Sequence, residues 1–242
     1  LLNIGPQHPA THGVLRIVIE LDGEEIKRAE PIIGYMHRGA EKLAEYRDAR
    51  QTLVLMNRHD WLSAFNNELG WTIAVERLAG IEVPDRAQWI RTMFAEWNRI
   101  MNHLVFMGSY PLELGAITPL FYTFREREMV LDVLEMITGQ RMNPAYVRPG
   151  GVAQDLPPGA VEKILDLLEV MRDRLPTYDD LLTGSPIWQR RLQGVAHLDL
   201  QGCLALGVTG PILRSAGLAW DLRKTEPYCG YETYDFDVPT ET

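Results

Sequence analysis

Two histidines near the start of the chain are the residues best suited to proton chemistry near neutral pH. His8 and His12 stand four residues apart in a segment that reads G-P-Q-H-P-A-T-H-G-V-L-R over positions 5–16. An imidazole gives up or takes a proton between about pH 5 and 8. The spacing would also suit two zinc ligands on one helix face, but Pro6 and Pro9 disfavour a helix here. The segment is therefore predicted to be a loop, and its histidines either move protons or only form loop hydrogen bonds.

A small β element is predicted to follow this loop. Residues 14–21 place Leu15, Ile17, Ile19 and Leu21 on one side of a period-2 pattern. Asp22-Gly23 is a typical hairpin turn, and residues 26–33 have the composition of the returning strand. Positions 1–36 are therefore predicted to form an N-terminal loop and β-hairpin.

Helical periodicity dominates the rest of the chain. Apolar residues recur at helical spacing over positions 60–78, 87–106 and 121–138, and Pro157-Pro158 precedes a fourth such pattern. Gly80 and Gly139 are expected to end the first and the third of these helices. The 87–106 stripe is opposed by Arg91, Glu96, Arg99 and His103, and the fourth helix is expected to bury Val161, Ile164, Leu165, Leu168 and Met171. After Pro176 we expect only loops and short helices. The predicted fold is mainly α with a small N-terminal β element (α+β), and positions 37–242 form a helical bundle.

Composition excludes several classes of function. A net charge of −9 over 242 residues argues against general nucleic-acid binding, and partners are expected to be proteins. No apolar run reaches the roughly 20 residues of a membrane-spanning helix, and the first residues lack a signal-peptide pattern. Cys203 and Cys229 form no C-x-x-C pair, so we expect free thiols and no iron-sulfur or nickel-iron centre held by this chain, and no other metal site.

Four motifs together resemble one protein family. They are the segment at positions 5–16, G-Y-M-H-R-G-A-E-K at 34–42, R-H-D-W-L at 58–62 and P-L-E-L-G-A-I-T-P at 111–119. In this order they resemble the D subunit family of the NADH-quinone oxidoreductases, the hydrogenase-large-subunit-like component of respiratory complex I. The resemblance continues through F-R-E-R-E, R-P-G-G-V and P-Y-C-G-Y-E-T-Y. Members of this family normally extend well beyond the position of Thr242, so the chain is expected to be a fragment that lacks the C-terminal part.

The resemblance implies a fold, a substrate and partners. The helical bundle would resemble that of the nickel-iron hydrogenase large subunit. The chain would belong to the peripheral arm of a proton-translocating complex, lining the site at which quinone, the substrate, is reduced. A [4Fe-4S] cluster would lie in the neighbouring iron-sulfur protein, the B subunit, and NADH and FMN would bind elsewhere in the complex. The B subunit, the C subunit and the membrane-embedded H subunit would be its partners at the cytoplasmic face of the cell membrane, which the chain would contact only through other subunits.

The resemblance also implies roles for three residues at the quinone. His12 matches the family histidine that hydrogen-bonds the headgroup, and Glu113 matches a carboxylate that pairs with this histidine. Without the family match, Glu113 would be interpreted as a solvated loop residue. Trp61 stands where the family has a catalytic tyrosine. An indole can stack on a quinone and donate one hydrogen bond, but it cannot release a proton.

Three further residues match positions near the partner's terminal cluster. Asn143 stands where many members have a histidine, and it cannot titrate. Arg38 and Arg58 match family arginines whose fixed positive charge would favour the reduced cluster. Taken singly, each arginine could equally form a surface salt bridge.

Two alternatives stay open from the sequence. The same scaffold serves in F420- or ferredoxin-fed quinone reductases and in hydrogenase-type complexes, whose electron donor binds to other subunits. A structural paralogue without quinone chemistry is the other alternative, and Trp61 and Asn143 are the two residues that keep it open.

Overall fold

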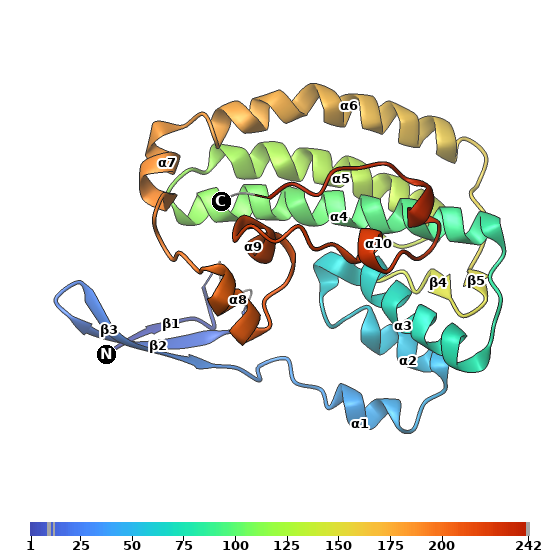
Figure 1. Ribbon diagram of the computed structural model, residues 1–242, viewed down its shortest axis with the longest axis horizontal. Helices are drawn as coiled ribbons and strands as arrows, with labels where there is room; N and C mark the ends of the chain where they lie inside the picture. The colour runs from blue at the N-terminus through green and yellow to red at the C-terminus, as the bar shows by residue number, and fades with distance from the viewer. Residues whose placement is uncertain (9–10, 12, 241–242) are drawn as a thin grey trace. The chain divides into compact units, whose positions relative to one another are not determined.

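The computed structural model describes residues 1–8, 11 and 13–240 (Figure 1). The chain forms two compact units, Leu1–Leu55 and Met56–Thr242, and each is described by itself. The division at position 36 that the sequence suggests stays a prediction. Both units agree with the predicted fold class, since the β element lies in the first unit and long helices make up most of the second.

The N-terminal unit contains a three-stranded antiparallel sheet in the order β1 (Leu2–Ile4), β2 (Arg16–Asp22) and β3 (Glu25–Ile32). The hairpin is confirmed: Arg16 pairs with Ile32, and Gly23 takes the positive φ of 62° that the turn requires. The predicted first strand starts at Arg16 and not at position 14. Strand β1 was missed, because three residues carry no recognisable alternation. Helices α1 (Ala40–Ala44) and α2 (Ala49–Met56) follow.

The C-terminal unit is built on four helices: α3 (Ala64–Ala79), α4 (Asp85–Glu113), α5 (Thr118–Thr138) and α6 (Ala160–Leu181). Helices α4, α5 and α6 run side by side, and α3 packs against α4 (Figure 1). A short turn, η2 (Trp61–Ser63), precedes α3, and strands β4 (Val147–Arg148) and β5 (Gly151–Val152) form a two-stranded sheet. The predicted bundle is therefore confirmed.

Some helix ends agree with the prediction and others differ from it. Gly80 and Gly139 terminate α3 and α5 in the left-handed conformation, as predicted. Helix α4 is longer than its stripe and includes Pro111 in its last turn, and α6 continues through Pro176. Beyond α6 the elements are short, as expected: α7 (Pro186–Leu192), α8 (Leu200–Leu206), α9 (Gly210–Ser215), α10 (Leu222–Thr225) and η3 (Tyr231–Thr233).

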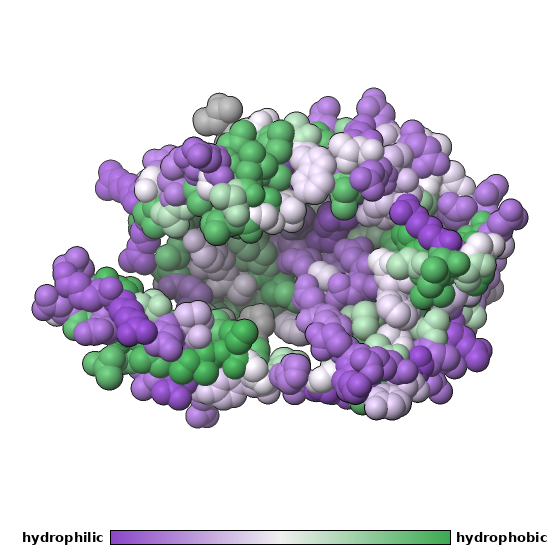
Figure 2. Space-filling model, turned by 60° about the horizontal axis from the view of Figure 1, so that its bottom comes forward, coloured by the Kyte–Doolittle hydropathy of each residue, from purple (hydrophilic) through white to green (hydrophobic). Residues whose placement is uncertain are grey.

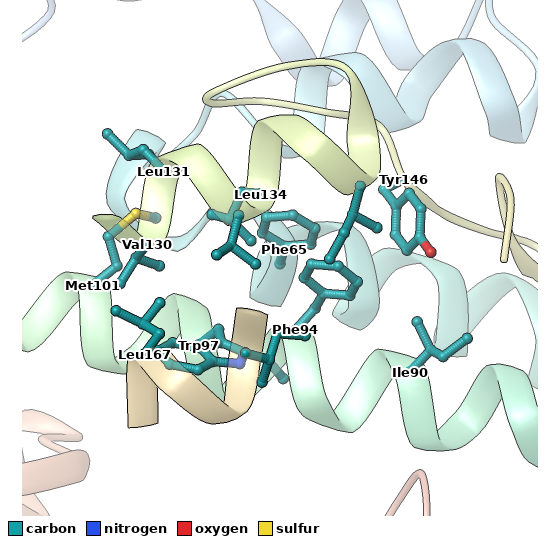
Figure 3. Packing of buried hydrophobic residues seen from close by; sticks show 14 of the residues in the cluster. Phe65, Ile90, Phe94, Trp97, Met101, Val130, Leu131, Leu134, Tyr146 and Leu167 are labelled. Atoms are coloured by element: carbon teal, nitrogen blue, oxygen red, sulfur yellow. The ribbon is translucent and has the colours of Figure 1, made fainter. Parts of the chain in front are cut away.

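The core lies between the four long helices (Figure 3). Phe65 of α3 stacks on Phe94 of α4 with ring centroids 4.9 Å apart, and the edge of Tyr146 meets Phe94 at the same separation. The prediction for α6 was partly wrong, since Val161 is 51% and Leu165 is 56% exposed. The buried stripe of α6 runs through residues 160, 164, 167 and 171, and neighbouring positions on a helix point about 100° away from it.

Arg91 was predicted on the polar face of α4 and is instead only 1% exposed. Its guanidinium forms a two-pronged ion pair with Glu76, with Nη1–Oε2 and Nη2–Oε1 distances of 3.0 and 2.6 Å. It also donates to the backbone carbonyls of Arg148 and Gly151, while Glu76 accepts the N–H of Gly150 at 2.8 Å. Burial of this ion pair is tolerated because nearly every donor and acceptor of the two side chains is satisfied.

Substitution of Arg91 by methionine should therefore destabilise the fold severely. Arg91→Met leaves the Glu76 carboxylate buried without its counter-charge, which costs about 3–5 kcal/mol. Arg86→Met is the matched control, because Arg86 lies on the same helix and pairs with Asp155, but both side chains are mostly exposed. Denaturant unfolding of the two purified variants should separate them widely. Equal midpoints would contradict a structural role for the buried pair.

Candidate functional site

The motif residues are distributed over both units. His12 lies outside the described residues, and Arg38 is exposed in the N-terminal unit just before α1. The C-terminal unit holds the other four: Arg58, Trp61, Glu113 and Asn143. The geometry of a candidate site can thus be built for the C-terminal unit alone.

Trp61 is the first residue of η2, and the preceding residue, Asp60, stabilises the start of this turn. Asp60 is extended, with φ −139° and ψ 104°, and its Oδ1 accepts the N–H of Leu62 at 3.0 Å. An aspartate in this position satisfies one of the free N–H groups at a helix start. The backbone conformation at Trp61 is therefore determined by Asp60.

Two asparagines of α4 hold the same turn from the side. Asn98 is fully buried, donates to the carbonyl of Leu62 and accepts the N–H of Phe65 at 2.9 Å. One helical turn later, Asn102 Nδ2 donates to Ser63 Oγ at 3.0 Å. These two residues escaped sequence reasoning, although asparagines four apart within an apolar stripe indicate buried polar partners.

The indole of Trp61 is 36% exposed and carries a cation against its ring. The guanidinium carbon of Arg127, from α5, lies 5.9 Å from the Trp61 ring centroid and 5.6 Å from that of Phe124. Both distances are within the range of cation–π attraction. Arg127 is almost fully buried, and this burial lowers the pKa of its guanidinium. The motif F-R-E-R-E contains Arg127, but no role was predicted for this residue.

The loop that carries Asn143 is held by a buried carboxylate of α3. Glu68 accepts the backbone N–H groups of Ala145, Tyr146 and Val147 at 2.8, 2.9 and 3.1 Å. It also accepts the side-chain amide of Asn57 at 2.9 Å. Burial raises the pKa of Glu68, and these four hydrogen bonds oppose that shift by favouring the ionised form.

Asn143 itself lies in the left-handed backbone region, with φ 54°, which asparagine tolerates better than most residues. Within the described chain its buried Oδ1 has no hydrogen-bond partner. The preceding residue, Met142, accepts a hydrogen bond at its Sδ from Arg127 Nη2 at 3.4 Å. Arg127 therefore contacts both the Trp61 ring and the loop that carries Asn143.

Glu113 and Arg58 stand apart from this cluster. Glu113 is exposed as the last residue of α4, eleven residues after Asn102, or about 16 Å further along the helix. Arg58 is exposed in the segment between α2 and η2. The predicted roles of both residues, and that of Arg38, stay predictions.

The chain's other possible binding features are limited. Among the residues that the structure describes, no group of three or more His, Cys, Asp or Glu side chains is placed to hold a metal ion. Cys203 is buried and Cys229 partly buried, and both are free thiols, as expected. None of the helices over the described ranges combines the length and the apolar character needed to cross a bilayer.

Glu68→Gln should loosen the Asn143 loop. A glutamine amide turns one acceptor oxygen into a donor that faces backbone N–H groups, at a cost of about 1–3 kcal/mol. Hydrogen exchange at Ala145, Tyr146 and Val147 should accelerate. The pKa of Glu68 is higher in the folded than in the unfolded protein, so the folded protein favours the protonated carboxyl. The free energy of unfolding of the parent should therefore fall as pH rises through the raised pKa, and Glu68→Gln should not show this fall. Unchanged exchange, equal to that of an exposed control such as Glu169→Gln, would contradict the role of Glu68.

Comparison with known proteins places the sequence of this chain in one family. Residues 113–242 match the family described as "Respiratory-chain NADH dehydrogenase, 49 Kd subunit". Proteins named as the D subunit of NADH-quinone oxidoreductase from Acidothermus cellulolyticus and Saccharopolyspora erythraea are 57% and 56% identical over the whole chain. A protein of that name from a Nocardioides species is 55% identical over 99% of it. The chain covers 56%, 54% and 54% of these relatives, so it spans about half of their length. The chain belongs to the family of the 49 kDa subunit of respiratory-chain NADH dehydrogenase, which includes the D subunits of NADH-quinone oxidoreductase.

Proposed function

We propose that the full-length protein is a peripheral-arm subunit of a proton-translocating NADH-quinone oxidoreductase, and that Trp61 lines its quinone-reduction site. The observation that carries the proposal is the Trp61 turn. A partly exposed indole sits at a family motif position, its backbone is held by Asp60 and Asn98, and a buried cation lies against its ring. Such a preorganised aromatic surface suits the flat headgroup of a quinone.

The reaction sets what each residue has to supply. Reduction of a quinone to a quinol takes two electrons and two protons. In this proposal the electrons come from a [4Fe-4S] cluster in the B subunit, and NADH and FMN act elsewhere in the complex. Trp61 binds the headgroup by stacking, and His12 acts as the proton donor, because an imidazole is partly protonated near neutral pH.

The position of Glu113 supports its pairing with a cation. A carboxylate at the last residue of a helix faces the negative end of the helix dipole, so it destabilises α4. Its carboxylate has no ion pair with any other described residue. We propose that it pairs with His12 in the complex, where it would orient the ring and favour its protonated form.

The remaining motif residues are proposed to surround the partner's cluster with groups that do not titrate. Arg38 and Arg58 are exposed and would lie near the partner's cluster, where their positive charge would favour its reduced state. Asn143 would replace a titrating neighbour of that cluster by a neutral amide.

The surface suits burial against other subunits. Figure 2 shows hydrophobic residues exposed between hydrophilic ones on one face of the molecule, and large side chains such as Ile33, Leu78 and Ile187 are mostly exposed. The B and C subunits and the membrane-embedded H subunit are the proposed partners, at the cytoplasmic face of the cell membrane. Apolar surface of this kind is usual where a subunit is covered in an assembly.

Photo-crosslinking of a quinone analogue to the intact membrane complex tests the proposal. We expect label on the peptides that carry His12 and Trp61, and we expect native quinone to compete it away. If an assembled, active complex carries no label on either peptide, the quinone site lies elsewhere. The chain would then be a structural paralogue, the alternative that Trp61 and Asn143 keep open.

Asn143→His should restore a titrating group beside the partner's cluster. A histidine there would couple reduction to protonation, so the cluster potential of the variant should fall more steeply with rising pH than that of the parent. Redox titration of the cluster at several pH values measures this slope. A slope that is already steep in the parent and unchanged in the variant would remove Asn143 from the cluster's surroundings.

A further inference from the structure

Arg127 is a buried cation with few of its donors in use. Within the described chain its Nε has no hydrogen-bond partner, and its Nη2 donates only to the sulfur of Met142, a weak acceptor. The nearest carboxylate, that of Glu128, is 3.9 Å away from Nη1. Its guanidinium also lies near the rings of Trp61 and Phe124.

Arg91 shows what a purely structural buried arginine requires in this fold. Its guanidinium binds both oxygens of Glu76 and the carbonyls of Arg148 and Gly151. Arg127 is buried nearly as deeply without that compensation. A charge that is costly to bury and poorly paired is more readily explained by a role at a site than by stability.

We infer that Arg127 is a positioning residue for quinone reduction. It holds the Trp61 ring in place and keeps a positive charge beside the quinone that stacks on this ring. This inference rests on the proposed function. In the proposed site, electrons that reach the quinone before its two protons would place negative charge on the quinone oxygens. A fixed cation behind the indole favours that charge, and it acts through the ring without touching the substrate.

The chemistry of the side chain explains why an arginine suits this place. The planar guanidinium lies 5.9 Å from the ring centroid of Trp61 and 5.6 Å from that of Phe124, and it keeps its charge even when buried. A lysine would supply charge but no plane. Arg127→Lys should therefore preserve part of the effect, and Arg127→Met should abolish it.

A double-mutant cycle in the intact complex tests the inference. Arg127→Met should lower kcat/KM for quinone about 10-fold, as expected for a lost cation–π and field effect. Trp61→Leu removes the ring through which Arg127 acts, so the double variant should be no worse than Trp61→Leu alone. Electron transfer from NADH to a water-soluble acceptor reports the amount of assembled complex. Arg141→Met removes an exposed charge from the loop that carries Asn143, where Arg141 pairs with Glu128, and this variant should stay within about twofold of the parent.

The outcomes separate the inference from the proposed function. If Trp61→Leu changes quinone kinetics while Arg127→Met does not, or if the two effects multiply, Arg127 does not act through the ring and the inference fails alone. If Trp61→Leu leaves quinone kinetics unchanged, the proposed function fails. Where Arg127→Met prevents assembly, Arg127→Lys decides: intermediate kinetics support the inference, and parent-like kinetics overturn it.

Discussion

Two buried carboxylates of α3 are the interactions on which the rest of the C-terminal unit depends. Glu68 and Glu76 are eight residues apart and therefore lie on one face of the helix. Glu68 accepts the N–H groups of residues 145–147, and Glu76 accepts that of Gly150 and pairs with Arg91 of α4. A segment with little regular structure is thus tied to two helices by ionic hydrogen bonds, which are stronger than neutral ones. The strands β4 and β5 are too short to hold this segment by themselves.

The candidate site has two parts. The geometry of one part is determined within the C-terminal unit, and the other part is exposed and available for an ion pair in the assembly. Trp61 and the Asn143 loop are held by contacts from α3, α4 and α5 within one unit, so their geometry does not need another subunit. Glu113 stands at the exposed end of α4, where its charge is unfavourable for the helix. Binding surfaces are often organised in this way, with a preorganised platform and a charged group that finds its partner only in the assembly.

The sequence predicted the elements better than the site, for a physical reason. Apolar periodicity depends on neighbours three and four residues away, so the four helices, the Asp22-Gly23 turn and the Gly139 terminus could all be predicted. The buried pair of Arg91 and Glu76 could not, because a charged residue is expected outside unless its partner, fifteen residues away, is known. The hydrogen bond from Asn98 to the Trp61 turn could not be predicted either, because it joins segments that are distant in the sequence. Periodicity also failed on α6, where two adjacent apolar stripes left the buried one undetermined.

Arg127 links Trp61 and Asn143, the two residues that the sequence resemblance predicts to depart from the family pattern. By that resemblance, each would replace a group that titrates by one that does not. Arg127 contacts Trp61 directly, and it also contacts Met142, the neighbour of Asn143. An arginine cannot be deprotonated in a protein either. The indole and the guanidinium beside its ring therefore offer stacking and fixed charge, and neither of them supplies a proton. If quinone is reduced on this ring, its protons have to come from another direction. The pairing proposed for His12 and Glu113 would supply a titrating group there, so that the binding of the headgroup and its protonation are carried out by different parts of the chain.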